Sequence, residues 1–192
     1  MSGSHFHVHG PHDHELEHAA QHGTQDAVSG RIAVTTAVLA TVGALFSYQG
    51  GATQADATLF KNNAAISKTE AANQWNYYQA KSSKQNLAEL AVEIAPPERR
   101  DAYRAQVQRY EGEKADIRKQ AERFEAESKD WDRRSDAALH LHHRWAQATT
   151  VIQISIALSA IALLTRRTWL LRGVYGVAAA GLVIGALAAA HV

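Results

Sequence analysis

Three long runs of uncharged, mostly apolar residues constrain the fold of this chain more than any other feature. The runs lie at residues 32–49, 149–164 and 174–190. Each is about 16–18 residues long, near the length at which an α-helix crosses a hydrocarbon core of roughly 30 Å. A soluble fold of 192 residues would need a large polar shell to cover three such helices. We therefore predict an all-α membrane protein. Its three transmembrane helices are placed at residues 31–50, 149–165 and 174–190.

Small residues within two of these runs favour close helix packing. Gly181 and Gly185 form a GxxxG pair, and Gly176 extends the same small-residue face in the third run. Ser155 and Ser159 form a similar pair in the second run. Small residues at this spacing let helices approach closely.

The composition excludes several classes of function. The chain has no cysteine, which removes disulfides, thiolate metal sites and thiol catalysis. Its formal net charge is +1, with acids and bases interleaved, so a nucleic-acid partner has no electrostatic support. Because no GxSxG, P-loop, HExxH or dinucleotide fingerprint occurs, we predict that the protein is not an enzyme and needs no cofactor.

Residues 51–148 are polar and rich in helix-forming residues. Residues 52–95 contain no glycine or proline, and residues 98–148 contain one glycine and no proline. Pro96 and Pro97 separate the two segments and predict a turn near 95–98. Two helices joined by a tight turn pack antiparallel most simply. We expect an extramembrane helical hairpin that runs into the first two spans without a break.

Both arms of this hairpin carry residues repeated every seven positions, which is typical of a coiled-coil seam. The alternative is one side of an ordinary amphipathic helix. In the second arm the repeat consists of Tyr103, Tyr110, Ile117, Phe124, Trp131, Ala138 and Trp145. In the first arm it consists of Leu59, Ile66, Ala80, Leu87 and Ile94. A two-helix hairpin this long leaves apolar side chains under-covered, so we expect a homo-oligomer.

The first arm also contains the stretch "NQWNYYQAKSSK", residues 73–84. We single out its aromatic and basic residues as a partner or packing motif: Trp75, Tyr77, Tyr78, Lys81 and Lys84. Stacking and cation–π contacts would let them hold a ligand or partner. The structural alternative, which we favour, is that they fill the seam against Tyr110, Phe124 and Trp131.

The same stretch resembles the signature of a family of small bacterial inner-membrane proteins, classed as a domain of unknown function. The resemblance extends from Arg31 onward and includes "LLTRRTWLL" before the last run. It implies three spans and a bacterial inner-membrane location, and it brings no activity, substrate or catalytic residue.

Residues 1–30 form a polar tail that we expect to be mobile. Candidate metal ligands in the tail are His5, His7, His9, His12, His14 and His18. Imidazole with nearby carboxylates suits Zn, Ni or Cu ions. Nothing in the sequence fixes a fold around them, so a flexible tail that binds metals loosely remains the alternative, and pH-dependent docking of the tail is a third reading.

The loop at residues 166–173, "RRTWLLRG", is short and basic. Short basic loops stay cytoplasmic, whereas a connection of about 100 residues can cross the membrane regardless of charge. This places the N-terminus in the cytoplasm and the hairpin in the periplasm. Arg133, Arg134 and Arg144 argue for the opposite orientation.

These features lead to one expected function and two alternatives. We expect a non-enzymatic, oligomeric scaffold or accessory subunit that acts through its hairpin on an unidentified membrane or periplasmic protein. The first alternative is metal binding or sensing through the histidine tail. The second is an oligomeric pore.

Overall fold

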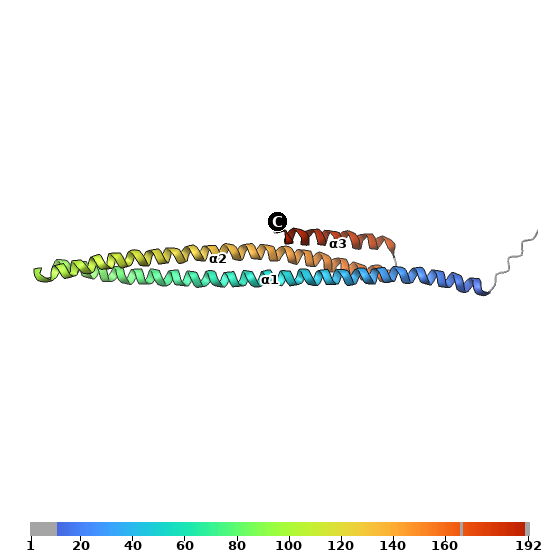
Figure 1. Ribbon diagram of the computed structural model, residues 1–192, viewed down its shortest axis with the longest axis horizontal. Helices are drawn as coiled ribbons and strands as arrows, with labels where there is room; N and C mark the ends of the chain where they lie inside the picture. Colours follow the sequence, from blue (N-terminus) through green and yellow to red (C-terminus); the bar gives the residue numbers. More distant parts are fainter. Residues whose placement is uncertain (1–10, 166, 191–192) are drawn as a thin grey trace, which may run out of the picture. The chain divides into compact units, whose positions relative to one another are not determined.

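The computed structural model describes residues 11–165 and 167–190, with side chains from residue 28 onward. This part of the chain is all-helical, as predicted (Figure 1). Helix α1 spans Pro11–Ile94, α2 spans Pro97–Thr165 and α3 spans Thr168–Ala189.

Each of the three helices contains a segment long and apolar enough to cross a membrane, which is consistent with a multi-pass membrane protein. In α1 an apolar segment continues without a break into a polar one. In α2 a polar segment continues without a break into an apolar one, as the sequence predicted for both helices. Helix α3 begins at Thr168 and not near 174, so most of the segment expected to be a loop is helical.

The proline pair determines where α1 ends and α2 begins. Pro96 disfavours helical geometry at the residue before it, and Pro97 occupies the first helical position, where no intrahelical hydrogen bond is needed. The Ala95 N–H still donates to the Ala91 carbonyl at 2.9 Å, and Arg100 Nε donates to the Ala95 carbonyl at 3.0 Å. The chain therefore leaves α1 with its last carbonyls partly satisfied.

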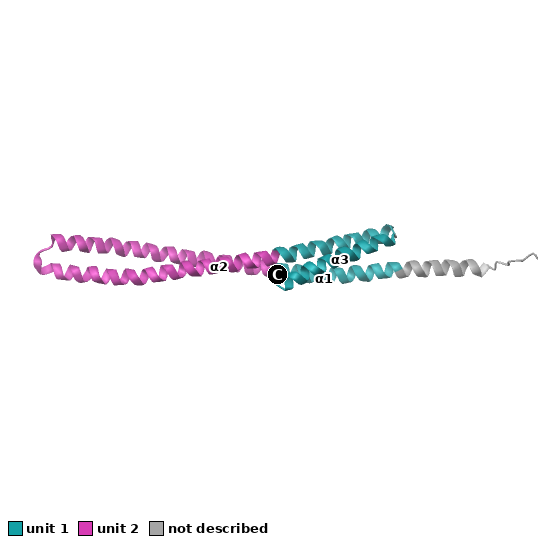
Figure 2. Ribbon diagram, turned by 90° about the horizontal axis from the view of Figure 1, so that it is seen from above, with its two compact units in different colours: residues 1–50, 143–192 teal, residues 51–142 magenta. Residues whose placement is uncertain are grey.

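The chain divides into two compact units (Figure 2). The first contains residues 1–50 and 143–192, and its core is formed by one or two residues from each helix. These core residues are Leu39, Ile152, Val174 and Ala178, with Val42, Phe46, Ile156 and Leu158 packed around them. The Phe46 and Trp145 rings lie 5.4 Å apart between centroids.

The buried hydroxyl groups of this first unit are paired within the protein. Ser155 Oγ donates to the Val174 carbonyl at 2.8 Å, which joins α2 to α3. The hydroxyls of Thr36 and Ser159 lie 2.8 Å apart, which joins α1 to α2. Such pairing suits a segment in hydrocarbon, where water cannot satisfy a polar group.

Two glycines of α3 allow close contact with its neighbours, as the GxxxG spacing predicted. A Cβ atom on Gly185 would lie 2.3 Å from the Phe46 ring, and one on Gly181 would lie 2.9 Å from Ile152. The expected extension of this face to Gly176 is wrong, because a Cβ there would meet nothing within 4 Å.

The second unit, residues 51–142, consists of α1 and α2 lying side by side (Figures 1 and 2). Ser128 Oγ donates to the Ala64 carbonyl and Ser135 Oγ to the Ala57 carbonyl, each at 2.9 Å. The later serine of α2 thus bonds the earlier alanine of α1. A side chain of one helix that bonds the backbone of the other requires the two helices to be very close.

Small residues spaced by seven make this closeness possible, and we call them the small-residue seam. They are buried on both helices: Ala57, Ala64 and Ala71 on α1, and Ala121, Ser128 and Ser135 on α2. Because these side chains are short, the two helix backbones can approach until the serine hydroxyls reach carbonyl oxygens.

On α1, the large residues of the seven-residue repeat that were expected to fill the seam are exposed instead. Leu59, Ile66, Leu87 and Ile94 are 55%, 61%, 66% and 76% exposed. On α2 the expected repeat does face α1, but apart from Ile117 and Trp145 it lies half-buried at the edge of the seam. Most large side chains of the two repeats therefore lie beside the close contact, whereas Ile117 is buried.

The close approach at α3 predicts a difference between two glycine substitutions. Gly185→Ala should destabilise the first unit by about 1–3 kcal/mol, because the new methyl group overlaps the Phe46 ring. Gly176→Ala should be neutral or gain up to about 1 kcal/mol, since alanine is the better helix former and the site is open. Equilibrium unfolding in mixed micelles, followed by circular dichroism, measures both; equal effects would contradict the packing.

Candidate functional site

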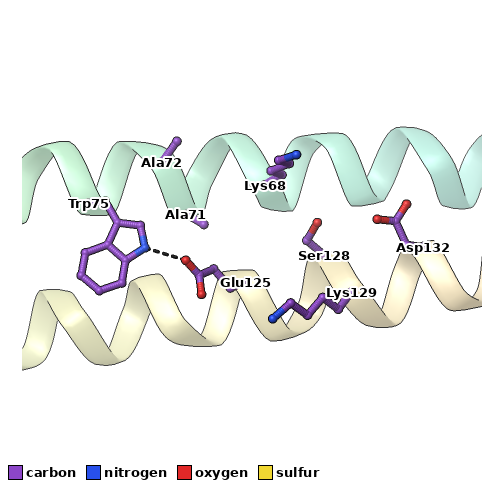
Figure 3. Close-up of a pocket in the computed structure, with 8 residues that line it drawn as sticks. All are labelled: Lys68, Ala71, Ala72, Trp75, Glu125, Ser128, Lys129 and Asp132. Carbon is purple, nitrogen blue, oxygen red and sulfur yellow. Dashed lines mark hydrogen bonds between the residues drawn. The ribbon is translucent and has the colours of Figure 1, made fainter.

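The aromatic and basic residues of the 73–84 motif lie on α1, and three of them face α2. Trp75 Nε1 donates to Glu125 Oε1 at 2.7 Å (Figure 3). The Trp75 and Tyr78 rings meet edge to face with centroids 5.6 Å apart. The indole therefore joins the two helices through its one polar atom while its ring packs along α1.

Lys81 has the most contacts of the motif residues. Its side chain is only 15% exposed, and Nζ donates a hydrogen bond to Glu113 Oε2 of α2. The same Nζ lies 5.2 Å from the centre of the Tyr77 ring and 5.5 Å from that of Tyr110. Lys81 is thus held by one carboxylate and two aromatic faces, from both helices.

A second lysine repeats this arrangement from the opposite helix. Lys114 Nζ of α2 lies 5.0 Å from the centre of the Tyr78 ring and donates to Gln85 Oε1 at 3.1 Å. Gln85 Nε2 in turn donates to Glu89 Oε1 at 2.8 Å. Each helix therefore places one lysine against a tyrosine of α1.

The electrostatics of the central pair follow from these contacts. The hydrogen bond to Glu113 raises the pKa of Lys81 above its usual 10.5, and burial opposes this only in part. The hydrogen bond from Lys81 lowers the pKa of Glu113 below its usual 4.5, and the charges of Arg109 and Lys84 act in the same direction. Both groups are therefore charged at neutral pH.

The remaining motif residues face outward. Tyr77 is 50% exposed, and Lys84 is exposed as well. The favoured interpretation, that the motif packs in the seam, fits Trp75, Tyr78 and Lys81. Of the expected partners, Tyr110 lies against Lys81, whereas Trp131 stacks on Phe60 at 5.7 Å between centroids.

An open groove runs along the seam beside Trp75. Its lining alternates in charge and comes from both helices: Lys68, Ala71, Ala72, Trp75, Glu125, Ser128, Lys129 and Asp132 (Figure 3). Trp75 and Glu125 bond each other at one end, and Asp132 accepts a hydrogen bond from Lys61 at 2.7 Å at the other. Lys68 and Lys129 are the groove's two basic side chains. Its two basic and two acidic side chains give the groove charges for a polar ligand.

The candidate metal ligands fall in two groups. His5, His7 and His9 lie outside the described residues. His12, His14 and His18 belong to α1, whose first residue is Pro11, although their side chains are not described. Among the side chains from residue 28 onward, leaving out 166, 191 and 192, no group of three or more His, Asp or Glu residues could hold a metal ion.

The small-residue seam is the feature that sequence reasoning missed. The signal was present, because Ala57, Ala64 and Ala71 recur every seven residues, as do Ala121, Ser128 and Ser135. Larger residues with the same period stand beside these positions, and a search for hydrophobic repeats selects the larger residues.

These observations define the class: a chain of three helices, each with a segment long and apolar enough to cross a membrane, and a long polar part built from two closely packed helices. The chain belongs to the DUF4337 family, a domain of unknown function, whose model matches residues 28–191. This confirms the resemblance to a family of unknown function. Comparisons with curated proteins and with solved structures gave no match.

The pairing of Lys81 with Glu113 predicts a pH-dependent coupling between them. At pH 7, Lys81→Met and Glu113→Gln should each destabilise the protein, and the double variant should lose less than the sum. The pKa of Glu113 is lowered in the folded protein, so its contribution is complete above pH 4.5, and the coupling should vanish in acid once the pH falls below that lowered pKa. The raised pKa of Lys81 keeps its contribution complete below pH 10.5.

Unfolding by denaturant of the four proteins at pH 7 and in acid measures this coupling. Arg118 and Glu122 provide the control cycle, because they form an exposed pair within α2 at 2.7 Å. Exposed pairs contribute little. A Lys81–Glu113 coupling no larger than that of the control, or unchanged in acid, would argue against the contact.

Proposed function

We propose that this chain is a non-enzymatic integral membrane protein whose polar part is an antiparallel, coiled-coil-like hairpin serving as an oligomeric scaffold or accessory subunit. One observation carries the proposal: the most distinctive polar side chains of the hairpin bind each other. Trp75 bonds Glu125, Lys81 bonds Glu113 and Lys114 bonds Gln85. These residues hold two helices together, and what remains for other molecules is the outer surface.

The location proposed is the bacterial inner membrane, with the N-terminus in the cytoplasm and the hairpin in the periplasm. The support for this orientation is the basic segment around the start of α3, which includes Arg167 and Arg172 and no acid. Trp169 is 62% exposed, as suits an aromatic residue at a membrane interface.

Self-association has support from the apolar segment of α2. Gln153 lies there with an exposed side chain. An amide in contact with lipid lacks hydrogen-bond partners, and glutamines in such segments commonly bond across helices. A second copy of the chain would supply such a partner.

Metal handling by the histidine tail remains the alternative function, with Zn, Ni or Cu as the ions. It gains one supporting observation, because α1 begins at Pro11 and includes His14 and His18, four residues apart. Two histidines at this spacing in a helix suit a shared metal ion.

Untagged protein extracted from its native membrane in mild detergent tests both functions together. We expect particles larger than one chain, containing several copies or one constant partner protein, and a metal content unaffected by deletion of residues 1–24. Monomers without a partner would contradict the scaffold. Bound metal that is lost with residues 1–24, together with loss of metal tolerance in cells, would favour the alternative.

A further inference from the structure

One side of α1 in the second unit is exposed and carries no charge over its whole length. We call it the uncharged face; its positions alternate by three and four residues. They are Ala55, Leu59, Asn62, Ile66, Thr69, Asn73, Asn76, Ala80, Ser83, Leu87, Leu90 and Ile94, all exposed. This spacing is that of a second coiled-coil seam, separate from the one that faces α2.

The face is less polar than its composition suggests. Thr69 Oγ1 donates to the Ala65 carbonyl at 2.9 Å, and Ser83 Oγ donates to the Gln79 carbonyl at 3.1 Å. Both hydroxyls thus bond to the backbone of their own helix. Leu87, Leu90 and Ile94 are 66%, 56% and 76% exposed and lie within two turns of each other.

Helix α2 differs sharply. Its exposed positions with the same alternating spacing include six charged residues: Asp101, Lys119, Glu122, Lys129, Arg133 and Asp136. A solvated helix in this protein therefore carries charge, as is usual. The twelve positions of the uncharged face on α1 carry no charge at all, which indicates a surface that another helix covers.

We propose that the uncharged face of α1 packs against the same face of a second copy of this chain. The inference rests on the proposed function, because copies anchored in one membrane share an orientation. Their α1 helices then run parallel, and each residue meets its own counterpart. The partner must be uncharged along the contact, since a charged helix would lose water there without gaining an opposite charge.

The asparagines of the face favour a second copy over another apolar partner. An asparagine amide both donates and accepts hydrogen bonds, so Asn73 opposite Asn73 of the second copy is satisfied. A slip along the seam would place it against Ile66 or Ala80 and leave the amide unpaired. An asparagine within an apolar seam specifies register and number of strands in this way.

The charges that flank the face agree with a parallel pair. In such a pair, a residue on one border meets the residue five positions later on the opposite border of the second helix. Ala65 therefore meets Glu70 of the second copy, and Gln79 meets Lys84. No two like charges are brought together by the symmetric arrangement.

Cysteine cross-linking in native membranes tests this surface, and the absence of native cysteine makes each site unambiguous. Oxidation of full-length Ile66→Cys, Asn73→Cys or Leu87→Cys protein should give a disulfide-linked dimer. The yield should exceed that of Ala115→Cys and Ala126→Cys, exposed on α2, by at least about fivefold. Equal yields at all five sites would indicate random collision and overturn the proposal.

A charge at the centre of the face provides the second variant. Asn73→Asp should reduce dimer formation by Ile66→Cys about tenfold at neutral pH, because two carboxylates would meet in the seam. Ala126→Asp is the matched control on α2 and should leave the yield unchanged. Circular dichroism should be the same for both, because both sites are exposed in the single chain.

Failure here is distinguishable from failure of the scaffold. If detergent-extracted particles still hold several copies while the α1 cysteines do not cross-link, the face is wrong and the oligomer stands. If the particles hold one chain and one constant partner protein, the self-pairing is wrong and the accessory role stands. If the particles are single chains and cross-links are absent, both proposals fail.

Discussion

The close approach of α1 to α2 is the constraint on which the second unit depends. Ser128 and Ser135 can donate to the carbonyls of Ala64 and Ala57 only because the side chains between the helices are as small as alanine and serine. Most large side chains line the borders of this narrow seam. Phe60 stacks on Trp131 there, and Trp75 reaches Glu125. The polar network of the motif is therefore a consequence of the narrow seam as well as a support for it.

The same use of small residues recurs in the first unit. Gly185 lies against the Phe46 ring, and Gly181 lies against Ile152. Buried hydroxyls join the helices, as between Ser155 and the Val174 carbonyl. Hydrophobic burial cannot hold helices together within lipid, so close packing and hydrogen bonds do this there. In the polar unit the small-residue seam is formed by alanine and serine. The leucine and isoleucine side chains of the α1 repeat, such as Leu59 and Ile66, lie exposed on the outside.

Much of the fold could be predicted from the sequence because its signals are local. Uncharged runs identify the segments that are long and apolar enough to cross a membrane, and Pro96–Pro97 marks the end of α1. The contact between helices could not be assigned correctly, because hydrophobicity at seven-residue spacing selects Leu59 and Ile66, whereas the contact requires small size. Trp75, Tyr78 and Lys81 lie toward α2, but their partners there depend on the register between the two helices, which no local sequence signal gives.

The register and closeness of the small-residue seam are tested most directly by an engineered disulfide within one chain. The pair Ala64→Cys with Ser128→Cys should oxidise readily in membranes, because the Ser128 hydroxyl lies 2.9 Å from the Ala64 carbonyl oxygen. The pair Ala64→Cys with Ser135→Cys, shifted by one heptad, should not. The account predicts an intrachain disulfide in the first protein alone. Oxidation of the shifted pair, or of neither, would contradict it.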